Sequence, residues 1–272
     1  RKDALSILFV VLSVIYLIPV FLVAMNSFKS NASINLETFA FPHEGTFVSL
    51  DNYIKGLTFG DYPFLKSAGY SLLITVVSAA LILLCTSMAA WYIARVGSAL
   101  SKTVYYLCVF SMVVPFQMVM FTLARTADKL KLNTPFTIPI IYLGFGAGLA
   151  VFMFSGFIKS IPLEIEEAAA IDGAGLLQTF VRIIFPQLQA CTISIVIMKG
   201  IAAWNSYLYP SYILQKPESH TIILLIKENF GAGEVNIQGA AACAVMGILP
   251  VIVIYLCLQK YFVRGQIDAA IK

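Results

Sequence analysis

Residues 160–187 read SIPLEIEEAAAIDGAGLLQTFVRIIFPQ, and they carry acids, small residues and glycines in a chain that is otherwise largely apolar. The stretch opens with Pro162, which lacks a backbone N–H and therefore fits the start of a helix better than its interior. Three acids follow in the same turn: Glu164, Glu166 and Glu167. Because the helix dipole stabilises negative charge at the N-terminal end, this pattern predicts a helix that starts near Pro162.

The middle of the stretch predicts a break between two short helices. Residues 168–170 are alanines, which favour a helix and have almost no side chain to keep another surface at a distance. Gly173 and Gly175 can then end the helix, since glycine adopts left-handed backbone conformations readily. A second helical pattern follows and closes at Pro186, and its apolar face comprises Leu176, Leu177, Phe180, Ile183 and Ile184. Helix, glycine break and helix together predict a rigid unit and not a catalytic pocket.

The composition of the whole chain is that of a membrane protein. Of the 272 residues, 60% are hydrophobic and 12% are charged, and the mean hydropathy is +0.87, which excludes a soluble globular domain. The net charge of +4 is thinly spread, so no binding of nucleic acid is expected. All five cysteines fall inside apolar runs without the spacing of metal ligands, so no metal site is expected either.

Several apolar runs reach the length of about 20 residues that a helix needs to cross a bilayer. The sequence predicts an all-α integral membrane protein, with residues 1–272 forming one transmembrane domain. Six spans are predicted, at residues 4–25, 67–94, 103–123, 138–158, 188–209 and 239–258. Residues 125–135 are expected to form a short polar loop, residues 211–238 a longer one and residues 260–272 a basic tail.

Two features of these spans bear on packing and orientation. The fourth span has glycines at positions 144, 146, 148 and 156, which permit close approach of neighbouring helices. Lysine and arginine are denser in the two termini, the link 95–102 and the stretch 160–187 than in the other polar segments, which favours placing these pieces on the cytoplasmic side. An even number of spans also puts both termini on one side of the membrane.

The opening stretch resembles the EAA motif of the membrane subunits of ABC importers. The family pattern is EAA, three residues, Gly, nine residues, and Ile-x-Leu-Pro. The chain matches it at Glu167-Ala168-Ala169, Gly173, Ile183 and Pro186, and departs from it at Phe185, which replaces leucine. The run Asp172-Gly173-Ala174 is similar to the form seen in the carbohydrate-uptake branch.

The resemblance extends over nearly the whole chain. Residues 49–53, 89–95, 203–207 and 259–265 look like further signatures of the family, whereas residues 266–272 depart from its usual ending. The most similar subfamily is that of the second permease subunits of oligosaccharide importers, which includes the MalG-like maltose type and the multiple-sugar or raffinose type. The resemblance implies a multi-pass permease in a bacterial cell membrane, with both termini and the EAA coupling helix, between spans four and five, in the cytoplasm.

The same resemblance implies a heteromeric complex. This chain would pair with a second homologous permease, two cytoplasmic ATPase subunits and an extracytoplasmic sugar-binding protein, all within membrane lipid. ATP and Mg²⁺ would be bound by the ATPases, and this chain would bind no cofactor and catalyse no reaction. The ATPase-coupling residues would be Glu164, Glu166, Glu167, Ala168, Ala169, Asp172, Gly173, Ala174 and Pro186.

Lys199 lies within the predicted fifth span, where a charge costs about 3 kcal/mol on insertion scales and therefore faces water or a partner. One interpretation is that it lines the translocation path and hydrogen-bonds sugar hydroxyls. The other is that it pairs with an acid of the second permease or reaches toward the membrane interface. Trp204, Asn205 and Tyr207 at the end of this span are candidates for the same path. An aromatic belt at the outer membrane interface explains the two aromatic residues equally well.

Other classes of function receive less support from the sequence. No HExxH, CxxC, P-loop or GxGxxG pattern occurs, and the two histidines, His43 and His220, lie in separate polar segments, so a membrane enzyme is not expected. A secondary transporter would show inverted repeats or an acid or histidine relay inside the spans, and neither is evident. An ABC importer of another solute stays open as an alternative to a sugar importer.

Overall fold

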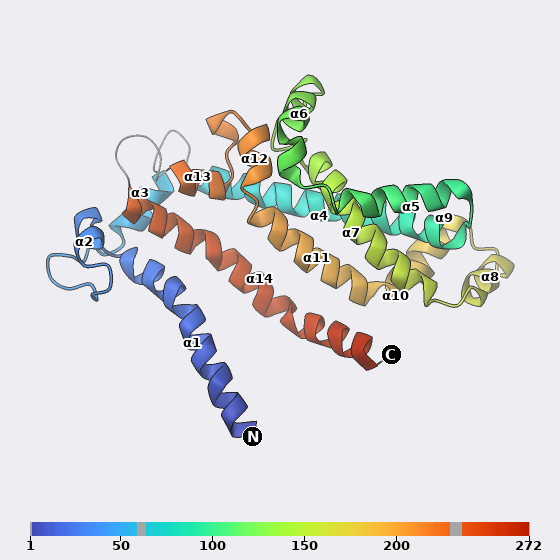
Figure 1. Ribbon diagram of the computed structural model, residues 1–272, viewed down its shortest axis with the longest axis horizontal. Helices are drawn as coiled ribbons and strands as arrows, with labels where there is room; N and C mark the ends of the chain where they lie inside the picture. Colours follow the sequence, from blue (N-terminus) through green and yellow to red (C-terminus); the bar gives the residue numbers. More distant parts are fainter. Residues whose placement is uncertain (1, 59–63, 229–235, 272) are drawn as a thin grey trace. The chain divides into compact units, whose positions relative to one another are not determined.

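A computed structural model describes residues 2–58, 64–228 and 236–271. It does not describe the side chains of residue 2, residue 258 and residues 260–271, so the side chains of the predicted basic tail lie outside the described part. The described chain is helical, and its only β-type pairing is an isolated bridge between Lys29 and Phe47 (Figure 1). The longer helices are α1 (Lys2–Asn26), α4 (Phe64–Arg95), α5 (Ala99–Ser111), α6 (Phe116–Lys129), α7 (Pro139–Lys159), α11 (Gln189–Trp204) and α14 (Ile237–Ile271).

Shorter elements connect these helices. They are α2 (Asn31–Leu36), α3 (Asp51–Thr58), α8 (Glu164–Ile171), α9 (Leu176–Thr179), the π-helical turn η1 (Phe180–Ile184), α10 (Phe185–Gln187), α12 (Leu208–Ile213), the 3₁₀ turn η2 (Pro217–Ser219) and α13 (Ile222–Glu228). The chain forms two compact units, one of residues 1–69 and 220–252 and the other of residues 70–219 and 253–272.

In the first unit, the segment after α1 is organised around a buried lysine. The Lys29 side chain is fully buried, and its Nζ donates hydrogen bonds to the carbonyls of Glu37, at 2.8 Å, and of Ala40. Asn52, also buried, donates from Nδ2 to the carbonyls of Ser27 and Lys29, each at 2.8 Å. A buried charge is tolerated only with such partners, so these bonds hold the polar segment 27–58 in one conformation.

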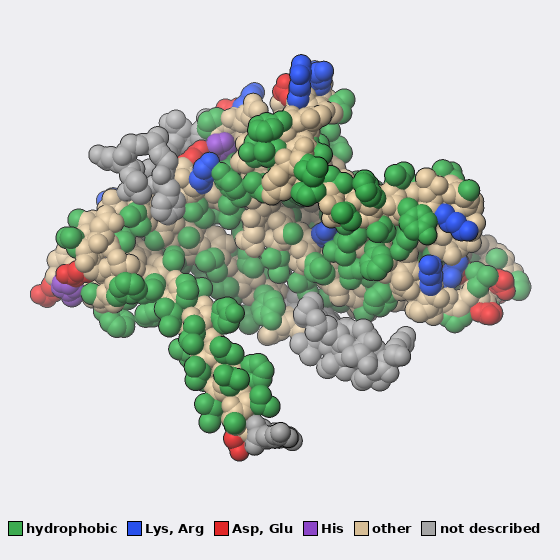
Figure 2. All heavy atoms as spheres, viewed as in Figure 1, with side chains coloured by type: hydrophobic (Ala, Val, Ile, Leu, Met, Phe, Trp, Pro, Cys, Tyr) green, Lys and Arg blue, Asp and Glu red, His purple; other side chains and the backbone are tan. Residues whose placement is uncertain are grey.

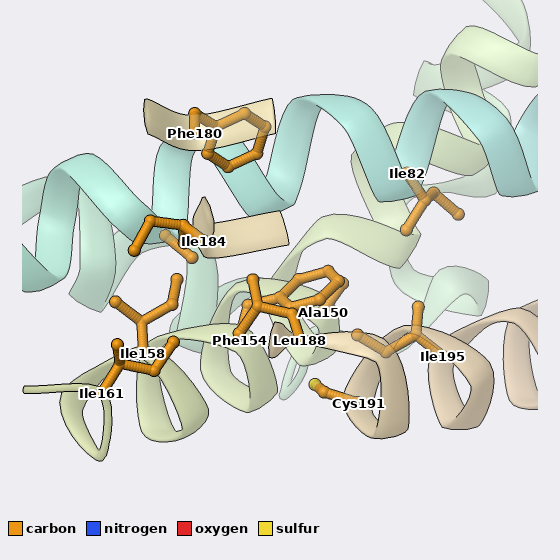
Figure 3. Packing of buried hydrophobic residues seen from close by; sticks show 11 residues of the cluster. Ile82, Ala150, Phe154, Ile158, Ile161, Phe180, Ile184, Leu188, Cys191 and Ile195 are labelled. Carbon is orange, nitrogen blue, oxygen red and sulfur yellow. The ribbon is translucent and has the colours of Figure 1, made fainter. Parts of the chain in front are cut away.

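The second unit contains the larger core. Side chains from α4, α7, η1 and α11 gather in one cluster, part of which Figure 3 shows: Ile82, Ala150, Phe154, Ile158, Ile161, Phe180, Ile184, Leu188, Cys191 and Ile195. Two of the four glycines of α7 lie at close contacts, as predicted. A Cβ on Gly146 would clash with Ile82 of α4, and one on Gly148 would clash with the Cys108 carbonyl of α5. Gly144 and Gly156 have open space instead.

Four described helices are long and apolar enough to cross a membrane: Asp3–Asn26, Phe64–Arg95, Pro139–Lys159 and Ile237–Cys257. Two bent pairs raise the number to six if each pair is counted as one span. The most apolar window of α1 has 0% of its residues buried in protein, and Figure 2 shows hydrophobic side chains along this helix. A helix with such a surface fits a hydrocarbon environment.

The third predicted span, 103–123, is broken in the structure. Helix α5 ends at Ser111, and α6 starts at Phe116 after a bend of 107°. Pro115 explains the break, because proline has no N–H to donate and disfavours helical geometry in the residue before it. Helix α6 also continues to Lys129, so the first part of the predicted polar loop 125–135 is helical.

The fifth predicted span, 188–209, is shorter than expected. Helix α11 runs from Gln189 to Trp204 and meets the preceding helical segment at an angle of 77°. It ends at Asn205, whose short polar side chain competes with helix hydrogen bonds. The separate helix α12 then begins at Leu208.

Candidate functional site

The stretch 160–187 forms the expected helix, glycine break and second helical segment. Helix α8 ends at Ile171, and Gly173 has φ +81°, a conformation that favours glycine. The N–H of Gly173 donates to the Ala170 carbonyl at 3.1 Å, and the N–H of Ala174 donates to the Ala169 carbonyl at 2.9 Å. These are the two bonds of a Schellman motif, so the predicted role of Gly173 in ending the helix is confirmed.

The second half of the stretch 160–187 packs into the hydrophobic core of the second unit. Phe180 is buried, and its ring lies 5.5 Å from that of Trp91 in α4, centroid to centroid. Ile184 is fully buried in the same cluster (Figure 3). Leu176 and Leu177, predicted on the same face, are 80% and 66% exposed instead. The π-helical turn η1 begins only at Phe180, and its i→i+5 bonds shift the register of Ile184 relative to these leucines.

The π-helical turn has a cause in the sequence. The N–H of Phe185 donates to the Phe180 carbonyl, five residues back. Pro186 follows and has no N–H, and its ring would clash with the carbonyl four residues before it in a regular α-helix. Pro186 therefore widens the helix and does not close it, and α10 continues to Gln187.

The first half of the stretch is mostly exposed. Among the predicted coupling residues, Glu164, Glu167, Ala168, Asp172 and Gly173 are exposed, Ala174 is half-buried and Ala169 is buried. Exposed apolar side chains lie beside these acids, and Ile171 at 86% is the most exposed of them. We call this acidic and apolar surface of α8 and α9 the α8 face. Glu166 differs from its neighbours, because Trp91 and Arg95 of α4 bind its carboxylate.

A cavity of about 410 Å³ lies in the same unit, among α4, α6, α7, α11 and the segment after α11. Its wall combines aromatic rings with a few polar groups, and it is lined by Ile82, Phe116, Tyr142, Phe145, Gly146, Lys199, Ala202, Ala203, Asn205, Ser206, Tyr207, Leu208 and Tyr209. We call it the aromatic cavity. Tyr209 is central to its wall, with ring centroids 4.6 Å from Phe116, 5.0 Å from Tyr142 and 5.2 Å from Phe145.

Three of the four predicted path residues line this cavity: Lys199, Asn205 and Tyr207. Trp204 is buried and does not line it. In the described part of the chain, the ion pairs join other residues, and no carboxylate pairs with Lys199. The aromatic residues Phe116, Tyr142 and Phe145 were missed, because they come from helices distant in sequence. The helix start after Pro115 was the one signal that could have indicated Phe116.

The groups that line the aromatic cavity suit binding and orientation of a polar solute. Within the described residues, no three His, Cys, Asp or Glu side chains lie close enough together to hold a metal ion. Aromatic faces can stack on the apolar faces of a ring, and Lys199 and Asn205 can donate hydrogen bonds to oxygen atoms.

Comparison with known proteins agrees with the fold. Over 96% of its length the chain superposes on 96% of a subunit of a bacterial ABC transporter that imports the acidic polysaccharide alginate, with a TM-score of 0.80. The two sequences are 22% identical, so this likeness concerns the fold.

Closer sequence relatives cover the chain from end to end. A probable permease for starch degradation products from Thermoanaerobacterium thermosulfurigenes, AmyC, is 32% identical over 100% of this chain and 97% of its own length. MelC, a melibiose, raffinose and stachyose import permease from Bacillus subtilis, is 32% identical over 98% of this chain and 96% of its own. Residues 82–268 match the family model described as binding-protein-dependent transport system inner membrane component. This chain therefore belongs to that family of bacterial ABC-transporter permeases, embedded in the membrane.

Proposed function

We propose that this chain is one permease subunit of an ATP-driven importer that moves a sugar, and specifically an oligosaccharide, into the cell by alternating access. Two relatives that are 32% identical to this chain are sugar-transport permeases by name, and they match over 98% or more of it. The observation that carries the mechanism is the α8 face, an exposed surface that continues into residues Phe180 and Ile184, which are buried in the core of the same unit.

In this proposal the two bent pairs each count as one span, which gives six spans. Both termini and the stretch 160–187 then lie in the cytoplasm, consistent with the higher density of lysine and arginine in these pieces. Residues 211–228 then face the outside, where a sugar-binding protein would dock. The family description itself refers to dependence on a binding protein.

The α8 face is the proposed contact with a cytoplasmic ATPase. A short helix that is seated in a partner's groove can pass on that partner's closure as a rigid-body movement. The exposed alanine and glycine positions allow close approach, and the exposed acids Glu164, Glu167 and Asp172 offer pairing to basic side chains. Two ATPase subunits would serve this chain and a second homologous permease.

The aromatic cavity is the proposed substrate path. Tyr207 and Tyr209 offer faces on which pyranose rings stack, and Lys199 and Asn205 offer donors to sugar hydroxyls. Pairing of Lys199 with an acid of the second permease is the alternative, since no described carboxylate of this chain takes that place. Trp204, which is buried and does not line the cavity, is not part of this proposed path.

The decisive experiment is reconstitution. This chain is co-expressed with the second permease, the ATPase and the binding protein encoded beside it, and the purified complex is placed in liposomes. We expect uptake of radiolabelled oligosaccharide that requires both ATP and the binding protein. Uptake by this chain alone under an ion gradient would overturn the proposal in favour of a secondary transporter. ATP-dependent uptake of a different solute, with no uptake of sugars, would overturn the substrate class only.

A further inference from the structure

Glu166 is held by α4, in contrast to the two other acids in the first turn of α8. Trp91 donates from Nε1 to Glu166 Oε2 at 3.0 Å, and Arg95 donates from Nε to Glu166 Oε1 at 2.8 Å. The Arg95 and Glu166 side chains are only 19% and 11% exposed, whereas Glu164 and Glu167 are exposed. Both carboxylate oxygens of Glu166 are thus occupied within the chain, so this acid is not available to an ATPase as it stands.

Arg95 also holds the link that precedes α8. Its Nη2 donates to the carbonyl of Ile161 at 2.9 Å, just after the end of α7, and lies 2.8 Å from Glu166 Oε1. One guanidinium therefore fixes the start of α8 and the residue before Pro162 together. Charge-assisted bonds of this kind are shorter and stronger than neutral ones, and the planar guanidinium fixes their direction.

Trp91 joins the same end of α4 to the second half of the stretch. Its ring packs against Phe180 of η1 at 5.5 Å, tilted by 33°, while its N–H binds Glu166. The last two turns of α4 thus contact both helices that flank Gly173.

The backbone alone connects α8 weakly to the spans. On one side is the link 160–163, and on the other is the single left-handed residue Gly173. If only these links held α8, a force applied to this exposed two-turn helix would rotate the helix about the links. The bonds from Trp91 and Arg95 remove that freedom, because they attach α8 sideways to a helix of 32 residues.

We propose that Trp91, Arg95 and Glu166 form a latch through which displacement of α8 by an ATPase is passed to α4, in addition to the two spans joined to this stretch by the backbone. The proposal rests on the coupling role proposed above for the α8 face. In it, Arg95 and Glu166 are positioning residues, because they act through α8 and touch neither the sugar nor the nucleotide.

The test uses the complete complex in proteoliposomes and measures sugar molecules imported per ATP hydrolysed. The variants are Arg95→Met, Glu166→Gln and Trp91→Phe, which keeps the ring against Phe180 and removes the N–H donor. The matched control is Lys102→Met, which removes a positive charge from an exposed side chain of the same predicted cytoplasmic link. A double variant, Arg95→Glu with Glu166→Arg, restores opposite charges in exchanged positions.

We expect Arg95→Met and Glu166→Gln to form complexes of normal composition that continue to hydrolyse ATP. The number of sugar molecules imported per ATP should fall about fivefold or more, a loss typical of a broken coupling between sites. Trp91→Phe should lose less, the charge-exchanged pair should regain part of the loss, and Lys102→Met should keep the parental ratio. A purely structural pair would lower the yield of complex and leave this ratio unchanged.

An unchanged ratio in both Arg95→Met and Glu166→Gln would overturn the latch. If Arg95→Met fails to assemble, Glu166→Gln, which keeps the shape of the side chain, decides the matter alone. Failure of the underlying coupling role has a different signature. In that case Glu167→Lys and Gly173→Pro, which alter the α8 face and its end, would also leave the ratio and the ATPase content of the complex unchanged.

Discussion

The α8 face and the aromatic cavity lie in the same unit but are built in opposite ways. The α8 face comes from one continuous stretch, in which a proline, three acids, alanines and Gly173 specify a short helix with a defined end. The aromatic cavity is assembled from α4, α6, α7, α11 and the segment after α11, with no local motif. The shape of the α8 face is therefore determined by neighbouring residues in the sequence, whereas the shape of the cavity depends on how distant helices pack.

The largest effect is expected at the end of α8, with a matched pair of glycines. Gly173→Pro demands a φ near −65° where the chain has +81°, and it removes the N–H that binds the Ala170 carbonyl, so the Schellman motif cannot form. We expect normal membrane insertion but loss of ATP-driven uptake and of the bound ATPase. These are measured by transport assays and by subunit stoichiometry after purification.

Gly175→Pro is the control for that experiment. Gly175 has φ −71° and ψ 160°, which proline adopts, and a Cβ there meets open space. Uptake should therefore remain near the parental rate. Equal loss from both substitutions would mean that the backbone conformation at Gly173 is not what matters.

The next prediction distinguishes residues of the stretch 160–187 that are buried in the core from residues that are exposed. Phe180→Ala removes a buried ring from the core and should destabilise the unit by about 3–5 kcal/mol. Leu176→Ala, at an 80% exposed side chain, should leave the unfolding temperature unchanged and weaken ATPase binding instead. Thermal unfolding in detergent, followed by ATPase retention on the purified complex, distinguishes the two outcomes. A lowered unfolding temperature in Leu176→Ala would contradict this division between buried residues that stabilise the unit and exposed residues that bind the ATPase.

A smaller effect is expected in the aromatic cavity at Lys199. Lys199→Met keeps the length of the side chain but loses a charged donor, worth about 1.5–3 kcal/mol per hydrogen bond, so uptake at limiting sugar should fall about tenfold or more. Met198→Leu, on the same helix and 45% exposed, should be silent. Full uptake together with full complex yield in Lys199→Met would remove both interpretations of this residue, as a sugar contact and as a partner of the second permease.

The smallest effect is expected at Tyr209. Tyr209→Phe keeps the ring that packs 4.6 Å from Phe116, so uptake should change less than twofold if stacking is its contribution, as sugar stacking uses the face and not the hydroxyl. Tyr209→Ala should reduce uptake much more, since it opens the cluster. Equal losses in both variants would assign the contribution to the hydroxyl group.

The sequence predicted the α8 face better than the aromatic cavity, because the face is specified locally and the cavity is not. The helix start after Pro162 and the helix end at Gly173 are local events, and both were predicted from residue types alone. The exposure of Leu176 and Leu177 was not predicted, because their spacing to Phe180 is that of one helix face and nothing local shows that burial begins only at Thr179. The break at Pro115 was visible in the sequence, yet the apolar run on both sides suggested one continuous span.

The cavity was predicted only in part. Lys199 was identified because a charge inside an apolar run is conspicuous, and Asn205 and Tyr207 because they stand at the end of that run. Phe116, Tyr142 and Phe145 carry no such signal, since aromatic residues are common in membrane helices and nothing local says which of them face a cavity. The role of Glu166 was hidden for a related reason: its partners Trp91 and Arg95 lie more than seventy residues earlier.

The most direct test of the central claim is site-specific photocrosslinking of the intact complex. Photoreactive benzoylphenylalanine is placed at position 171, where Ile171 is 86% exposed beside the end of α8, and as a control at position 152, where Phe152 is 51% exposed on α7. After irradiation, the coupling role predicts an adduct with the ATPase subunit from position 171 and none from position 152. An intact, ATPase-containing complex that gives no ATPase adduct from position 171 would contradict it.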